Sequence, residues 1–189
     1  MLKKLVGAGV IVLFGVMMTA ASGAQAPTMA KMSGASKASA VIKDAMGKEV
    51  ATATVEDMGG SAHITVTAKG VAAGTHGLHV HTVGKCEPGA DPTQAATNFT
   101  TGGGHFNPDG KKHGLENPDG PHKGDLENLV VAANGTGKAS FMPKGVTVAA
   151  LLDADGSAIV IHQTADDNKT DPSGASGPRI ACGVITAAK

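Results

Sequence analysis

Short runs in which apolar and polar residues alternate occupy the chain from about residue 37 onward. The first four runs are KASAVIK (37–43), KEVATATVED (48–57), AHITVTAKG (62–70) and HGLHVHTV (76–83). Alternation with a period of two is typical of half-buried β-strands, because successive side chains of a strand point to opposite faces. Turn-forming residues separate the runs. This half of the chain therefore predicts a series of short strands.

The alternating pattern stops between Cys86 and Asp125, in a stretch dense in Gly, Pro and Asp. A connection of this length is uncommon and indicates a functional or a disordered segment. Strand patterns resume in LENLVVAANGTGKASFMP (126–143), SAIVIHQ (157–163) and RIACGVITA (179–187), and Asn134-Gly135 predicts a tight hairpin turn. Short strands separated by turns predict an all-β antiparallel sandwich or barrel. Aromatic residues make up only 2% of the chain, so we expect a core of Val, Ile, Leu and Ala.

The first 24 residues differ from the rest of the chain. A short basic start, MLKKL, precedes an apolar run, and the small-residue motif SGA follows at 22–24. This order is typical of a secretory signal peptide, which predicts export to the periplasm or the outside of the cell and no stable membrane insertion after cleavage. The alternative is an uncleaved anchor, because the apolar run is close to spanning length. Residues 25–36 are small and polar and predict a flexible tether, and 37–189 predict a single domain.

Charge and cysteine content narrow the function further. Without Lys3 and Lys4 the chain keeps 14 basic and 16 acidic residues, a formal charge of −2 that does not suggest nucleic-acid binding. Cys86 and Cys182 are the only cysteines, and export favours a disulfide between them over two free thiols. That bond would close a long loop, a contribution of roughly 4–5 kcal/mol in the chain-entropy model. A cysteine metal site is disfavoured, because neither residue has a cysteine neighbour at ligand spacing.

Two histidines in one predicted strand suggest a metal site. His79 and His81 share one face of an extended strand, about 6.5–7 Å apart at Cα, so their imidazoles can converge on one ion. The alternative for an isolated HxH pair is two exposed strand histidines. A third histidine in a strand pattern, His162, lies in SAIVIHQ.

The Gly-rich segment holds a second set of ligand types. It contains three histidines and one carboxylate at spacings of 8, 9 and 3 residues: His105, His113, His122 and Asp125. Three imidazoles and a carboxylate are a plausible tetrahedral set for a divalent ion such as zinc. A segment with so much Gly and Pro would gain order by folding around a metal. With the strand histidines, the chain predicts two metal sites.

Five motifs together strongly resemble the copper-zinc superoxide dismutase family, in its exported bacterial-like form. They are GLHVHTVG, GGGHFNPDGKKHG, PHKGD, IVIHQTADD and GPRIACGVI, and the resemblance runs from about residue 39 to 188. It implies an eight-stranded Greek-key β-barrel. It also implies an enzyme that converts superoxide to oxygen and hydrogen peroxide by copper redox cycling, with zinc as a structural and tuning ion.

The resemblance assigns roles to individual residues. It implies copper ligation by His79, His81, His105 and His162, and zinc ligation by His105, His113, His122 and Asp125, with His105 shared. It implies a disulfide between Cys86 and Cys182. Arg179 is expected to attract and orient superoxide, His105 to deliver a proton, and Asp166 to join imidazoles of the two sites by hydrogen bonds. His76 is expected to be a hydrogen-bonded barrel residue without a metal role.

Some features depart from the best-known members of the family. The segment 86–105 is longer than in cytosolic eukaryotic enzymes. The segment 163–178 is short, and Lys169 is its only cation, so the source of electrostatic steering is open. Dimer contacts differ between branches, which leaves a homodimer open. The main alternative is a non-catalytic metal-binding module, but a complete set of copper ligands together with Arg179 favours an enzyme. A structural cell-surface domain would be expected to lack some of the ligand residues.

Overall fold

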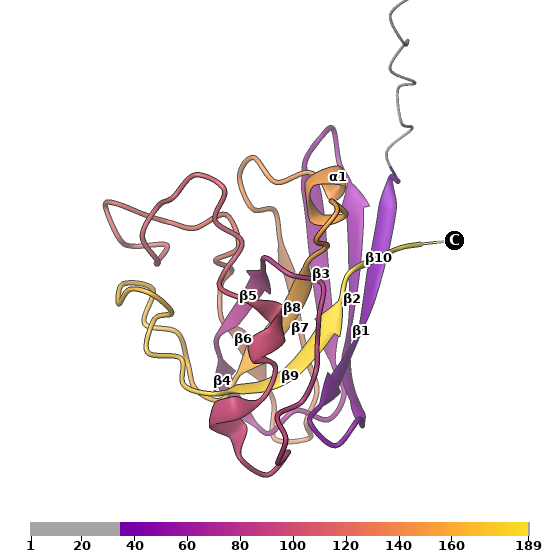
Figure 1. The fold of residues 1–189 in the computed structure, drawn as a ribbon, viewed down its shortest axis with the longest axis vertical. Helices are drawn as coiled ribbons and strands as arrows, with labels where there is room; N and C mark the ends of the chain where they lie inside the picture. Colours follow the sequence, from indigo (N-terminus) through magenta and orange to yellow (C-terminus); the bar gives the residue numbers. More distant parts are fainter. Residues whose placement is uncertain (1–34, 189) are drawn as a thin grey trace, which may run out of the picture. The chain divides into compact units, whose positions relative to one another are not determined.

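The computed structural model describes residues 35–188 (Figure 1). The predicted signal peptide (1–24) and most of the predicted tether (25–36) lie outside the described residues. In 35–188, no helix is long and apolar enough to cross a membrane.

Strands form in each of the predicted runs, although the run 76–83 is divided, so the predicted all-β class is confirmed. The strands of the described region are β1 Lys37–Asp44, β2 Glu49–Asp57, β3 Ala62–Ala68, β4 Gly74–His76, β5 Leu78–His81, β6 Leu129–Val131, β7 Gly137–Phe141, β8 Ala158–His162, β9 Arg179–Val184 and β10 Thr186–Ala187. Three single-turn helices accompany them: η1 Ala95–Thr97, η2 Thr100–Gly102 and α1 Val148–Leu151.

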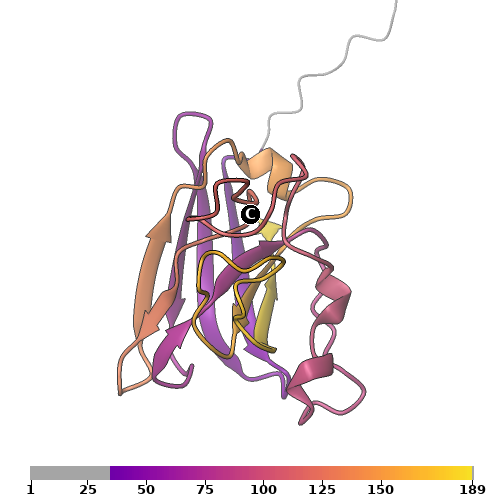
Figure 2. The same ribbon diagram turned by 90° about the vertical axis from the view of Figure 1, so that its left-hand side faces the viewer.

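Most strands belong to one curled antiparallel sheet of eight strands (Figures 1 and 2). Its order is β5-β8-β9-β1-β2-β3-β7, with β10 paired to β1, and a separate two-stranded sheet joins β4 to β6. Sequence-distant strands such as β1 and β9 pair, as in Greek-key arrangements. This order brings β5 and β8, which carry the strand histidines, side by side at one edge.

The predicted strand 76–83 is divided in the structure, which corrects the sequence-based expectation. Its first part belongs to β4 and its second part to β5, in different sheets. The break falls at Gly77, whose N–H donates to Thr164 O at 2.8 Å and whose carbonyl accepts from His162 N at 2.9 Å. A Cβ at Gly77 would lie only 2.7 Å from Ser176 Cβ, so the close approach of the segment 163–178 requires glycine.

The turn predicted at Asn134-Gly135 forms, but it does not close a simple hairpin. Gly135 has a φ of +77°, and Ala132 N donates across the turn to Thr136 O at 2.8 Å. The flanking strands take other partners, because β6 pairs with β4 and β7 pairs with β3. The turn therefore connects the two sheets.

Alternation explains the core on β3, where Ala62, Ile64, Val66 and Ala68 are buried and the residues between them are partly exposed. Each fully buried Ile or Val contributes about 1.5–3 kcal/mol. In contrast, β8 is buried at every position. Its Ile159 and Ile161 face the main core, whereas Ala158 and Val160 pack in a second cluster with Phe99 and Cys182.

The disulfide between Cys86 and Cys182 fastens the long segment that follows β5 to strand β9, and the described residues include no free cysteine. The predicted disulfide is therefore present. Phe99, which packs beside Cys182, is 2% exposed. The inserted stretch between Cys86 and His105 thus packs through Phe99 on Ala158 and Val160 and covers the outer face of β8.

The segments 106–125 and 163–178 pack on each other at the same edge of the sheet (Figure 2). Glu116 N donates to Asn168 O at 3.0 Å, and Lys169 Nζ lies 2.9 Å from Glu116 Oε2. Lys169, the only cation of the short segment, is therefore engaged with the other segment.

Candidate metal centre

Four imidazoles meet at the β5–β8 edge, and we call them the strand cluster. Each offers a ring nitrogen within 4.8 Å of the others: His79, His81, His105 and His162. The first two follow each other on one face of β5, as the HxH spacing predicts, and the last ends β8. His105 joins them because it forms an isolated β-bridge with His81.

In three of these rings one nitrogen is hydrogen-bonded and the other has no partner within residues 35–188. His79 Nε2 donates to Asp166 Oδ2 at 2.6 Å, His81 Nδ1 to Gly103 O at 2.9 Å and His162 Nδ1 to Gly177 O at 2.9 Å. These acceptors fix the proton on the bonded nitrogen. The opposite nitrogens, His79 Nδ1, His81 Nε2 and His162 Nε2, are buried and unpaired.

Burial keeps these imidazoles neutral. It lowers the pKa of His79 to about 3 and the pKa of His162 to about 4. Burial, and then the positive charge of Arg179, hold the pKa of His81 well below its usual range. Neutral imidazole is the form that binds metals, so the strand cluster presents converging lone pairs without a proton to displace.

The second cluster lies on the segment after η2, and we call it the loop cluster: His105, His113, His122 and Asp125. Three Nδ1 atoms surround one oxygen, Asp125 Oδ1, at 2.9 Å, 3.0 Å and 3.1 Å for His105, His113 and His122. His105 Nδ1 and His122 Nδ1 are 3.4 Å apart. The other carboxylate oxygen, Oδ2, accepts from Gly114 N and His122 N, both at 2.9 Å.

Carboxylates dominate the electrostatics of the loop cluster. Burial alone would lower the pKa of His113, but hydrogen bonds with Asp125 and Asp166 outweigh it and raise that pKa to about 9. Burial opposes ionisation of Asp125, yet its bonds with His105 and His113 hold the pKa of this carboxyl well below its usual range. The loop cluster is therefore built to hold positive charge, whether a proton or a metal ion.

Asp166 connects the clusters. Its Oδ2 accepts from His79 Nε2, and both of its oxygens lie within hydrogen-bond distance of His113 Nε2, at 3.0 Å and 3.1 Å. Burial would raise the pKa of this carboxyl, but the bonds from His113 and His79 lower it, so it stays ionised. A single carboxylate thus orients one imidazole of each cluster.

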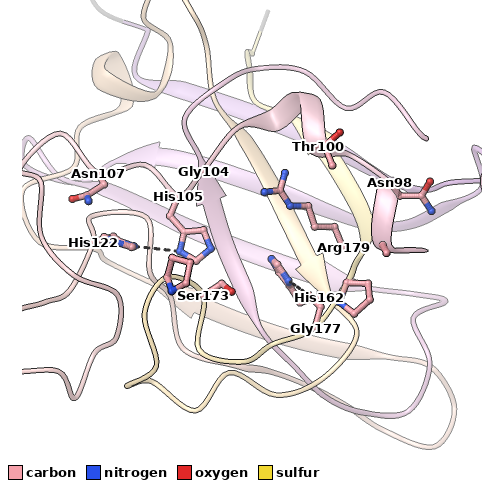
Figure 3. A pocket seen from close by; sticks show the side chains of 13 residues that line it. Asn98, Thr100, Gly104, His105, Asn107, His122, His162, Ser173, Gly177 and Arg179 are labelled. Carbon is pink, nitrogen blue, oxygen red and sulfur yellow. Dashed lines mark hydrogen bonds between the residues drawn. The ribbon is translucent and has the colours of Figure 1, made fainter. Parts of the chain in front are cut away.

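Arg179 faces a cavity of about 490 Å³ that opens onto both clusters (Figure 3). His105, His122 and His162 line the same cavity. Among the described residues that line it, Arg179 is the only lysine or arginine, and none is acidic. Its Nη1 donates to Phe99 O and its Nη2 to Gly103 O, both at 2.7 Å, which fixes the guanidinium at the cavity wall. The cavity therefore suits a small anion.

The donor sets fit two metal ions. Ligands about 2.0–2.1 Å from a tetrahedral zinc ion lie roughly 3.3 Å apart, close to the spacings around Asp125 Oδ1. The three unpaired imidazole nitrogens of the strand cluster suit copper, and buried polar atoms without a partner are otherwise costly. All seven residues predicted as ligands come together in these clusters, and none is left outside.

Several residues of the centre escaped the sequence analysis. Gly103 O, Gly177 O and Phe99 O hold two imidazoles and the guanidinium through main-chain carbonyls, which every residue carries. The left-handed conformation of Phe99, with a φ of 58°, is unusual for a large side chain and has no local sequence signal. The expected barrel role of His76 is confirmed, since its ring is buried and bonded to His162 O at 2.8 Å and Ala72 O at 3.0 Å.

Comparisons with known proteins point to one family. Residues 49–185 match the model of copper/zinc superoxide dismutase (SODC). A copper-zinc superoxide dismutase of Aquifex aeolicus is 38% identical over 155 residues, which cover 79% of this chain and 86% of the relative. One from Caulobacter vibrioides is 37% identical, with 78% of this chain and 84% of the relative covered.

Solved structures share the fold. Copper-zinc superoxide dismutase from Brucella abortus superposes with a TM-score of 0.65 at 28% identity, over 79% of this chain and 99% of the other. A SOD-like protein from Bacillus subtilis gives a TM-score of 0.67 at 35% identity, over 78% and 97%. In this chain the shared fold brings together two groups of side chains that could hold metal ions. The chain belongs to the copper/zinc superoxide dismutase family.

Proposed function

We propose that this protein is a superoxide dismutase that binds copper in the strand cluster and zinc in the loop cluster. The observation that carries the proposal is the set of three buried, unpaired imidazole nitrogens beside an arginine-lined cavity. His105 contributes Nδ1 to the loop cluster, and its other nitrogen, Nε2, remains for the strand cluster. His105 is therefore the one imidazole that belongs to both donor sets.

The reaction converts two superoxide ions and two protons to oxygen and hydrogen peroxide. Copper, when bound, supplies the one-electron redox chemistry, and zinc fixes the geometry of the loop. The polypeptide supplies access, orientation and protons. Its cavity admits a small anion, and the neutral imidazoles of His79, His81 and His162 keep their protons on the nitrogens that donate to Asp166 Oδ2, Gly103 O and Gly177 O, so that the opposite nitrogens would be free to hold copper.

Arg179 binds and orients the substrate. Its two terminal nitrogens donate to Phe99 O and Gly103 O, and the guanidinium still carries its positive charge into the cavity. Since the described lining residues include no other lysine or arginine, short-range attraction of superoxide depends on this side chain. Lys169 is paired with Glu116 and contributes less.

His105 delivers a proton. Burial lowers the pKa of His105, so its ring is neutral at rest. Its Nδ1 is held by Asp125, which leaves Nε2 as the atom that can take up a proton and pass it to the reduced substrate in the cavity.

Superoxide decay followed by stopped flow tests the function. Protein loaded with both metals should accelerate decay in proportion to its copper content, whereas zinc-only protein should not. His63→Ala, which changes a β3 histidine outside both clusters, is the matched control and should keep full activity. Fully loaded protein that removes superoxide no faster than the zinc-only form would refute the proposal.

We also propose that residues 1–24 are a signal peptide, that 25–36 are a tether and that the folded domain is exported to the periplasm or the outside of the cell. The beginning of β1 at Lys37 and the disulfide support this division, since disulfides persist in oxidising compartments. Fractionation of a bacterial host that produces the full chain, followed by N-terminal sequencing, tests it. We expect periplasmic protein that begins near Gln25; membrane-bound protein that retains Met1 would contradict cleavage.

A further inference from the structure

The orientation of Asp166 depends on what holds its main chain, because its carboxylate must reach an imidazole of each cluster at once. Its main-chain N–H donates to Asn128 Oδ1 at 2.8 Å, and its carbonyl accepts from Asn128 Nδ2 at 2.9 Å. The carboxamide of Asn128 therefore binds both main-chain polar groups of Asp166, which lies 38 positions away in the sequence.

Asn128 is also tied to the loop cluster through the chain. It lies three residues after Asp125 and directly before β6. Asp125 lies within hydrogen-bond distance of His113 Nδ1 and Asp166 of His113 Nε2, so a carboxylate holds each nitrogen of this imidazole. Asp125, His113, Asp166 and Asn128 thus form a closed ring of contacts that links the loop cluster to His79.

We propose that Asn128 is a positioning residue that fixes Asp166 between the two clusters and thereby sets the zinc affinity and ligand geometry of the loop cluster. The inference rests on the proposed metal assignment. Asn128 touches neither set of donor atoms and acts only through Asp166.

The chemistry of the contact selects asparagine. Both a donor and an acceptor are needed on one short side chain, and a carboxamide provides them. An aspartate at this position would keep the acceptor but would bring a carboxylate oxygen against the Asp166 carbonyl. An alanine would leave both main-chain groups of Asp166 without this partner, and an unmade buried hydrogen bond is costly.

Asp166 has little freedom to compensate. Its Oδ1 also accepts from Asn168 N at 2.6 Å. On its other side lies Gly174, with a φ of +62°, where a Cβ would collide with the carboxylate of Asp166. The carboxylate therefore occupies a tight site, and a shift of its main chain must be transmitted to His113 and His79.

The test compares Asn128→Ala and Asn128→Asp with Asn134→Asp, the same charge change in the exposed turn between β6 and β7. Zinc affinity is measured by chelator competition on copper-free protein. The absorption spectrum of Co²⁺ in the loop cluster is recorded on the same samples. Outer-shell partners of metal ligands typically contribute 10–100-fold in affinity, and we expect about tenfold weaker zinc binding and a shifted cobalt spectrum for both Asn128 variants. Asn134→Asp should match the wild type.

Wild-type zinc affinity in the Asn128 variants would overturn the proposal. A loss of thermal stability in the metal-free protein, with an unchanged cobalt spectrum, would also overturn it, because it would indicate a purely structural contact. If Asn128→Ala does not fold, the zinc affinity and cobalt spectrum of the nearly isosteric Asn128→Asp decide whether the proposal holds. None of these readouts uses superoxide, so the inference can fail while the dismutase assignment stands, and the reverse.

Discussion

The two clusters share His105 but are held by different forces. The strand cluster rests on β5 and β8, where burial fixes neutral imidazoles whose protons are bound by Gly103 O, Gly177 O and Asp166. The loop cluster rests on a segment without strands, where three Nδ1 atoms surround one carboxylate oxygen and the pKa of His113 is raised to about 9. One cluster presents bare lone pairs, and the other presents negative charge to whatever cation occupies it.

This difference shows how one site can serve two metals. Copper must cycle between two oxidation states, which suits neutral imidazoles positioned by strands and by the disulfide-fastened stretch 86–105. Zinc has no redox role and can act as a fastener of a Gly-rich segment that has few apolar residues of its own. The comparison therefore predicts that changes in the strand cluster affect turnover, and that changes in the loop cluster affect order and zinc binding.

Removal of a strand-cluster ligand should give the largest effect. We expect His162→Ala to lower superoxide removal by more than about 100-fold, beyond the 10–100-fold typical of outer-shell partners. The barrel and zinc content should persist, because β8 is buried at every position and His162 is its last residue. Metal analysis and stopped-flow decay on one sample check this. Substantial activity in copper-loaded variant would contradict the role of the strand cluster.

Removal of the loop carboxylate should separate the two clusters. Asp125→Ala deletes the oxygen atom on which three imidazoles converge. Loss of a partner that only orients a metal ligand typically weakens metal binding 10–100-fold, so for loss of a direct ligand we expect zinc affinity to fall by about 100-fold. Copper binding should change much less. Chelator competition measures the first effect, and limited proteolysis of the segment 86–125 should show faster cleavage. Unchanged zinc binding with unchanged protease resistance would count against the assignment.

Arg179→Glu should reduce turnover without loss of metal. The substitution reverses the charge at the cavity wall, so we expect catalysis to fall by about 10- to 100-fold, the scale of electrostatic guidance. Wild-type decay should also slow as salt rises, because screening weakens attraction between exposed charges. Full metal content with undiminished turnover in the variant would remove Arg179 from the mechanism.

The smallest effect concerns the support of Arg179. Asn98 is 3% exposed, its Oδ1 accepts from Gly89 N at 2.9 Å and its Nδ2 donates to Pro92 O at 3.1 Å. It thereby holds the insertion next to Phe99 O, the partner of the guanidinium. We expect Asn98→Ala to lower kcat/KM about 3- to 10-fold, less than the 10²-fold that a 1 Å misplacement can cost. The control is Asn134→Ala in the exposed turn between β6 and β7, and the copper and zinc contents of the two variants should match. An unchanged kcat/KM in Asn98→Ala would show that the stretch 86–105 does not position Arg179.

Local patterns predicted the strands and the ligands, because both depend on information within a few residues. The alternation of Ile64 and Val66 with polar neighbours defines β3, and the HxH spacing puts His79 and His81 on one face. Nonlocal features were beyond the sequence. The division of 76–83 depends on Ser176 packing against Gly77, about a hundred residues away, and the strands beside Asn134-Gly135 pair elsewhere for reasons of topology.

The outer support of the site was hidden for a similar reason. The side chain of Asn128 binds main-chain groups of Asp166, and the side chain of Arg179 binds the main-chain carbonyls of Phe99 and Gly103. Main-chain partners leave no residue type to recognise, so only the folded arrangement reveals them. The roles of Arg179 and Asp166 themselves were implied by family motifs and could not be derived from spacing.

The position of each metal tests the central claim most directly. Crystals of protein loaded with both ions should be measured at the copper and zinc absorption edges. We expect a copper anomalous peak among His79 Nδ1, His81 Nε2 and His162 Nε2, and a separate zinc peak beside Asp125 Oδ1. Zinc in the strand cluster, or copper only in the loop cluster, would contradict the division of roles between the two clusters.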